Sequence, residues 1–213
     1  MENKQPANLN VYLITDNTYS MKQSCLAAKK SFSEVLVVGN LATGKRCVTI
    51  GVIGDYDNGS PDCAQGGFTL LRPGVTDTNA QKLWFEKYML PSGGEGEPKA
   101  YKTLLNFLLR EPPGILLLFL DALPHGALGK ALDNQGTLEQ KFLQQNNMIQ
   151  DWGTLTTAYK DAGFCAVTFV TGNMFQKNPR ALKVYADLGY VVEVKNNKSS
   201  DITNAMRFLD NSR

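Results

Sequence analysis

Two acidic residues each follow an apolar segment, at positions where the functional residues of folded proteins are often found. Asp16 comes directly after the run Val11–Thr15 and opens the turn Asp16-Asn17-Thr18-Tyr19-Ser20, which carries one carboxylate and two candidate hydroxyls on alternate residues. Asp121 comes directly after the strongest apolar run, Ile115–Leu120. Oxygen donors this close together suit Mg²⁺, which prefers octahedral oxygen ligands and retains some of its water.

A glycine-rich segment lies between the two acids in the sequence. Ser92–Pro98 places Glu95 among three glycines, and backbone without side chains can approach a ligand closely. Simpler explanations stay open at all three places. Ser20 with Gln23 forms a capping box at a helix start, an aspartate after a strand is often a turn former, and the glycine loop could only connect two helices.

Short apolar runs alternate with helical spacing along the chain, which predicts strands and helices in alternation. Six helices are expected. The first runs from Met21 to Leu36, where apolar residues recur at helical spacing, and five further helices follow it. The expected strands are Val11–Thr15, Cys47–Gly54, Phe68–Leu71, Ile115–Leu120, Cys165–Val170 and Tyr190–Val194. The further helices are Asn79–Met89, Ala100–Leu109, Leu138–Ala162 with a break near Gly153, Arg180–Leu188 and Ile202–Leu209.

This alternation predicts an α/β fold: one doubly wound, mostly parallel sheet of about six strands with helices on both faces. The connection Asp55–Gly67 is polar and has no helical pattern, so Phe68–Leu71 is expected as an antiparallel strand at or near an edge. Ligands of such sheets bind beyond the carboxyl ends of the strands, where Asp16 and Asp121 are expected.

Length and composition favour one domain, 1–213, with its core at about 10–209. The formal net charge of +2 gives no basic field for nucleic acid, and the longest apolar run is too short to span a bilayer. The N-terminal sequence lacks a signal-peptide pattern, and the four cysteines form no zinc pattern. We therefore expect buried free thiols and a cytoplasmic location.

Four segments, in order, resemble the von Willebrand factor type A family, and in particular its intracellular members near alpha-kinases. Asp16-x-Thr18-x-Ser20 is similar to the D-x-S-x-S signature, with Thr in place of the first Ser. Three more segments resemble the family's second-strand ending, its glycine-rich loop and its "TDAPPHG" stretch: Gly51–Asp57, Gly93-Gly94-Glu95 with Pro98, and Leu118–Asp121 with Pro124-His125-Gly126.

The resemblance implies a metal-ion-dependent adhesion site for Mg²⁺ or Mn²⁺. Thr18 and Ser20 would bind the ion through their hydroxyls, and Asp16 and Asp121 would hold it, often through water. Glu95 is the nearest match to the threonine that the third loop usually supplies. The loop is one residue longer than the family pattern, and Lys99 stands where that pattern has an acid.

The implied function is a non-enzymatic interaction domain whose metal binds an acidic side chain of a partner protein. Such a domain could serve as a subunit of a larger assembly. One alternative keeps the fold as a scaffold or structural subunit with a vestigial metal site. A second alternative is a phosphotransferase of the haloacid-dehalogenase type with Asp16 as nucleophile. It lacks the usual second aspartate and a clear lysine for the charge that develops in phosphoryl transfer.

Overall fold

The computed structural model describes residues 9–16, 21, 28, 30, 46–54, 56, 68–71, 83, 99–170 and 180–194. These residues contain six strands and four α-helices, with a short 3₁₀ turn, η3, at Ala127–Gly129. The strands are β1 (Leu9–Asp16), β2 (Arg46–Ile53), β3 (Phe68–Leu71), β4 (Ile115–Leu120), β5 (Cys165–Val170) and β6 (Tyr190–Glu193). The helices are α3 (Tyr101–Leu108), α4 (Asn134–Gln145), α5 (Trp152–Asp161) and α7 (Ala181–Ala186).

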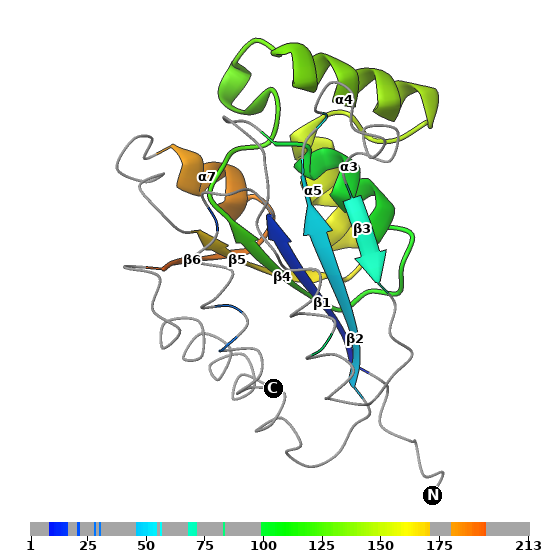
Figure 1. Ribbon diagram of the computed structural model, residues 1–213, viewed down its shortest axis with the longest axis vertical. Helices are drawn as coiled ribbons and strands as arrows, with labels where there is room; N and C mark the ends of the chain where they lie inside the picture. The colour runs from blue at the N-terminus through cyan, green and yellow to red at the C-terminus, as the bar shows by residue number, and fades with distance from the viewer. Residues whose placement is uncertain are drawn as a thin grey trace, which may run out of the picture.

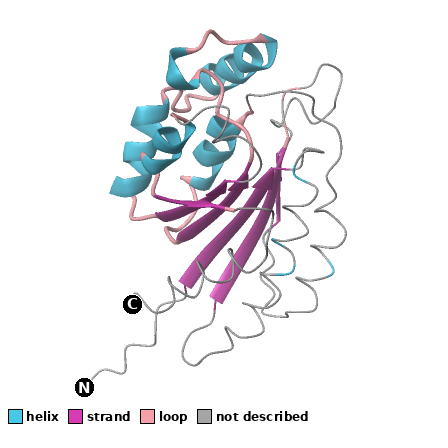
Figure 2. Ribbon diagram, turned by 90° about the vertical axis from the view of Figure 1, so that its left-hand side faces the viewer, coloured by secondary structure: helices cyan, strands magenta, loops and turns pink. Residues whose placement is uncertain are grey.

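The described strands form one sheet in the order β3-β2-β1-β4-β5-β6 (Figure 1). Neighbouring strands from β2 across to β6 pair in parallel, and β3 pairs antiparallel with β2 at the edge. The α/β class with a mostly parallel sheet, expected from the sequence, is confirmed. The helices described lie to one side of the sheet (Figure 2). The helices expected from Met21 to Leu36, at Asn79–Met89 and at Ile202–Leu209 lie almost wholly outside the described residues, so the expected helices on both faces stay a prediction.

The middle of the sheet is buried because its strands are apolar on both faces. All six residues of β4 are buried, and Val11–Asp16 of β1 are buried beside them. A strand with helices or core on both sides has no solvent-facing positions, so its sequence reads as a continuous apolar run rather than an alternation. This burial makes the ends of β1 and β4 the first places where polar side chains can gather.

Helix α3 brings its apolar stripe onto the sheet. Tyr101, Leu104, Leu105 and Leu108 are each at most 1% exposed and belong to the main core cluster. Their spacing follows the helical repeat, so one face of α3 is buried along its whole length. The start of α3 is therefore fixed against the sheet, next to the end of β1.

The helical segment expected at 138–162, with a break near Gly153, is two helices; its expected start was wrong, and its expected end agrees to within one residue. Helix α4 begins before Leu138 because Asp133 caps it, accepting a hydrogen bond of 2.7 Å from the Gly136 amide. Helix α5 begins after a second cap, Asp151, which accepts from the Thr154 amide at 2.8 Å. The break precedes Gly153, because an aspartate cap satisfies amides that the helix itself leaves unpaired. None of the described helices is long and apolar enough to cross a membrane.

Candidate functional site

Asp16 and Asp121 lie at the carboxyl ends of adjacent parallel strands. Asp16 is the last residue of β1, and Asp121 is the first residue after β4. In the register of these strands, Thr15 pairs with Phe119, so both acids come within two residues of the last pair. The chain continues from β1 toward β2 on one side, while β4 and β5 lie on the other. Such a reversal of strand order opens a crevice at the carboxyl edge of the sheet.

Asp16 is a fully buried carboxylate. Its exposed fraction is 0%, and its Oδ2 accepts a hydrogen bond of 2.6 Å from the hydroxyl of Tyr101 in α3. A hydrogen bond to an ionised acceptor is shorter and stronger than one between neutral groups. The start of α3 therefore fixes one oxygen of Asp16 in position.

The charges of both acids contribute to the raised pKa of Tyr101. Its pKa is raised well above 10.0, first by burial, then by the charge of Asp16, by Tyr185 and by the charge of Asp121. Asp121 itself is half-buried. The phenol therefore stays protonated and remains a donor, and the two carboxylates lie within electrostatic reach of the same side chain.

The loop that follows β4 is fastened to the segment before α3. The Lys99 amide donates to the carbonyl of Leu123 at 2.8 Å, and the His125 amide donates to the carbonyl of Lys99 at 3.2 Å. The hydroxyl of Tyr185 in α7 donates to the carbonyl of Ala122. Asp121 thus leaves β4 on a loop held from two sides, which limits the positions its carboxylate can adopt.

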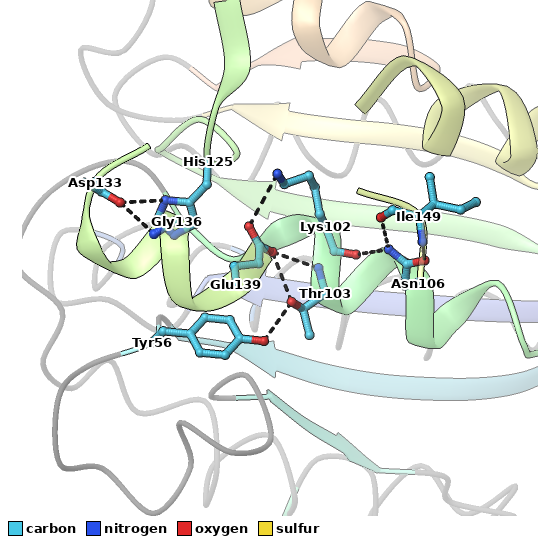
Figure 3. Close-up of polar contacts among 9 residues, drawn as sticks. All are labelled: Tyr56, Lys102, Thr103, Asn106, His125, Asp133, Gly136, Glu139 and Ile149. Carbon is cyan, nitrogen blue, oxygen red and sulfur yellow. Dashed lines mark hydrogen bonds and ion pairs between the residues drawn. The ribbon is translucent and has the colours of Figure 1, made fainter. Parts of the chain in front are cut away.

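His125, the only histidine in the sequence, is directed toward the start of α4. Its side chain is buried, and its Nδ1 lies 3.3 Å from Oδ1 of Asp133 (Figure 3). The next residue, Gly126, has φ of 73°, a left-handed conformation that glycine adopts without strain. His125 therefore ties the loop after β4 to α4.

Three of the five residues predicted to bind metal, Thr18, Ser20 and Glu95, lie outside the described residues. The complete ligand set therefore stays a prediction. Within the described ranges, no three His, Cys, Asp or Glu side chains form a group that could hold a metal ion. Two carboxylates at one edge need hydroxyls or a further acid from the remaining loops to complete a hard-cation site, and oxygen donors of this kind fit Mg²⁺.

Sequence reasoning missed Tyr101 as a member of this site. A signal for it existed: a tyrosine on a stripe of leucines is buried, and a buried phenol usually finds a hydrogen-bond partner. The sequence pattern predicted only a helix over Ala100–Leu109. The partner, a carboxylate on a strand far away in the sequence, could not be read from that pattern.

No protein-family model and no curated protein matches this sequence. Solved structures do share its fold. A pilus adhesin, SpaC from Lactobacillus rhamnosus GG, superposes with a TM-score of 0.64 at 10% identity, over 99% of this chain and 31% of the adhesin. A proximal thread matrix protein from the mussel byssus gives 0.60 at 11% identity, over 95% of this chain and 47% of that protein.

This chain therefore spans less than half the length of the solved structures it matches. An open-conformation structure of the same adhesin gives a TM-score of 0.61 at 11% identity. At these identities the likeness establishes the fold.

Proposed function

We propose that this chain is an interaction domain of the von Willebrand factor A type, doubly wound with helices on both faces. Its site at the carboxyl edge would bind Mg²⁺ or Mn²⁺ and, through the ion, an acidic side chain of a partner protein. The observation that carries this proposal is the placement of Asp16 and Asp121 at the ends of adjacent parallel strands, at the reversal of strand order, with Tyr101 hydrogen-bonded to Asp16. Two acids placed together at the end of a buried sheet are costly unless a cation compensates them.

Each residue of the proposed site would contribute a different oxygen ligand to the ion. Tyr101 donates to Oδ2 of Asp16 and holds this carboxylate at the edge of the sheet, where it would bind the metal or its water. Thr18 and Ser20 would add neutral hydroxyls from the turn after β1, and Asp121 would act from the loop after β4. When bound, the ion supplies the positive charge that attracts an anionic oxygen of the partner.

A binding role suits the sequence better than phosphoryl transfer. The chain lacks the second aspartate and the clear lysine that a phosphotransferase of the haloacid-dehalogenase type uses. One of the proteins with this fold, solved in two forms, is described as a pilus adhesin, which adds weak support for protein binding. A reducing, cytoplasmic setting and membership of a larger assembly remain part of the proposal; Cys165 in β5 is a free thiol, which is compatible with that setting.

The test is a calorimetric titration of the protein with MgCl₂ and MnCl₂, beside thermal melts. Wild type should bind, and at 100 times the dissociation constant the ion should add about 2.7 kcal/mol of stability. Asp16→Asn and Asp121→Asn should each abolish the heat of binding and the melting shift. Asp187→Asn, an exposed carboxyl at the end of α7, is the matched control and should bind as wild type does.

A folded wild-type protein that binds neither ion would overturn the metal proposal and favour the scaffold alternative. Binding that survives both substitutions would place the ion elsewhere. Glu95→Thr tests the third loop separately, since it replaces an anionic ligand by a neutral one. If Glu95 binds the ion directly, the variant should hold a model carboxylate such as acetate more tightly at saturating Mg²⁺, because less negative charge already surrounds the metal.

A further inference from the structure

A second carboxylate, Glu139 of α4, is buried away from the Asp16 site. It is 0% exposed, and its Oε1 accepts hydrogen bonds from the amide of Thr103 at 2.9 Å and from the Thr103 hydroxyl at 3.1 Å. The hydroxyl of Tyr56, just after β2, lies 3.0 Å from the same Thr103 hydroxyl (Figure 3). Glu139 therefore joins α4 to α3 through one residue.

Glu139 supplies the N-terminal cap that no residue of helix α3 provides. The N-cap of α3 is Ala100, which has no capping side chain. Thr103 is the third residue of that helix, and its amide is one of the donors that a helix leaves unpaired at its start. The carboxyl group of Glu139 therefore caps α3 from outside, and the positive end of the helix dipole offsets only part of the cost of burying a charge there.

Helix α4 lies at the end of the sheet toward which β1, β2 and β4 point (Figure 1). It buries only three of its residues, Gly136, Glu139 and Leu143, and the middle one is a carboxylic acid. Phe142 adds ring contacts to Tyr56 and Phe107, with centroids 6.0 and 6.2 Å apart. With so little apolar area buried, the docking of α4 depends on the state of Glu139.

The charge of Glu139 is only partly compensated. Its Oε2 is buried and accepts no hydrogen bond within the described residues, and Lys102 Nζ lies 3.9 Å away, beyond hydrogen-bond range. His125, from the loop after β4, is a second group that lowers the pKa of Glu139, and its Nδ1 lies 3.3 Å from Oδ1 of Asp133. An ionised carboxylate with one unsatisfied buried oxygen is costly, and a proton removes that cost.

We propose that α4 is a proton-controlled cap over the carboxyl edge of the sheet, closed when Glu139 is protonated and loosened when Glu139 is ionised. The control does not depend on the metal site. Helix α4 lies at the same end of the sheet as Asp16 and Asp121. The pH would therefore set how accessible that end of the sheet is.

The direction of this control follows from linkage. Burial raises the pKa of Glu139, and the charges of Lys102 and His125 and the hydrogen bonds of Thr103 lower it by less. A carboxyl whose pKa is higher in the docked state binds its proton more tightly there. Docking is therefore favoured below the raised pKa and weakens as the pH rises through it.

Hydrogen exchange followed by mass spectrometry tests the proposal on the full chain. Protection of the α4 amides, corrected for intrinsic rates, should fall as the pH rises from about 5 to about 8, because the docked state binds the Glu139 proton more tightly than the undocked state does. Amides of α5 serve as the internal reference and should change little. Constant or rising protection of α4 across this range would overturn the proposal.

Two variants separate the proton from other causes. Glu139→Gln keeps an acceptor for Thr103 and cannot ionise, so its α4 protection should be independent of pH and as high as that of acidic wild type. Lys102→Met removes the nearest positive charge, so the loss of protection should move to higher pH. Glu193→Gln, an exposed glutamate in β6, is the matched control and should keep the wild-type profile. A wild-type profile in Glu139→Gln, or an unchanged midpoint in Lys102→Met, would assign the pH dependence to another group.

Discussion

Tyr101 and Asp16 lie 85 residues apart in the sequence, and the Tyr101 hydroxyl donates to Oδ2 of Asp16 over 2.6 Å. Both side chains are buried, so neither can exchange this partner for water without opening the domain. The bond fixes the first turn of α3 to the last residue of β1. The stability that this bond contributes therefore depends on what else binds at the carboxyl edge of the sheet.

Removing that hydroxyl should destabilise the domain and should do so in a metal-dependent way. Tyr101→Phe removes a hydrogen bond of 2.6 Å to a buried carboxylate, which costs about 1–3 kcal/mol of unfolding free energy. Urea denaturation in a chelator measures this cost, and saturating Mg²⁺ should reduce it because the ion compensates the same carboxylate.

The matched control is Tyr159→Phe. Tyr159 is equally buried, but its hydroxyl donates to the carbonyl of Leu105 at 2.8 Å, away from both acids. Its loss of stability should be the same with and without Mg²⁺. A metal-independent cost in Tyr101→Phe would separate Tyr101 from the ion.

Asp151 should stabilise the domain in a way that depends on pH. Its pKa is lowered by the hydrogen bonds it accepts from the Thr154 amide and the Thr154 hydroxyl. A lowered pKa means that the stabilisation is present above the unfolded value of 3.8 and is lost as the pH falls through the folded value. Asp151→Ala should cost about 1 kcal/mol near neutral pH, as loss of a helix cap does, and little near pH 2. Equal costs at both pH values, measured by urea denaturation, would contradict this account.

Asn106 should contribute more to the unfolding free energy than the size of its side chain suggests. Its side-chain amide donates to the carbonyls of Lys102 and Ile149, each at 2.8 Å, and its oxygen accepts from the Ile149 amide at 2.8 Å. Asn106→Ala leaves two backbone groups of the α4–α5 connection unpaired, which should lower the unfolding free energy by about 1–3 kcal/mol. Asn146→Ala, which removes one exposed bond to Phe142, should cost less than about 0.5 kcal/mol.

Two glycine-to-alanine substitutions should have opposite effects. A Cβ on Gly114, just before β4, would lie 2.2 Å from the carbonyl oxygen of Asn10, so the strands must move apart. The expected loss is about 3 kcal/mol. A Cβ on Gly153, in the first turn of α5, meets nothing closer than 3.4 Å, and helical alanine there should add about 0.4–1 kcal/mol. Thermal melts that show the same sign for both would reject this interpretation.

The sequence by itself determined the α/β class, the limits of β4 and β5, and the position of both acids at strand ends. These features depend on local patterns: an unbroken apolar run marks a strand buried on both faces, and a polar residue that follows it must leave the sheet. The antiparallel pairing of β3 also followed from a local cue, the absence of helical spacing between it and β2.

Only the tertiary structure decided which distant side chains meet. That Tyr101 holds Asp16, and that Glu139 caps a helix 36 residues before it, depends on how α3 and α4 settle on the sheet. Periodicity specifies that a residue faces inward, but it does not specify what it faces. A buried polar group takes whichever partner the packed elements bring within about 3 Å, and that choice is made by the whole fold rather than by neighbours in the sequence.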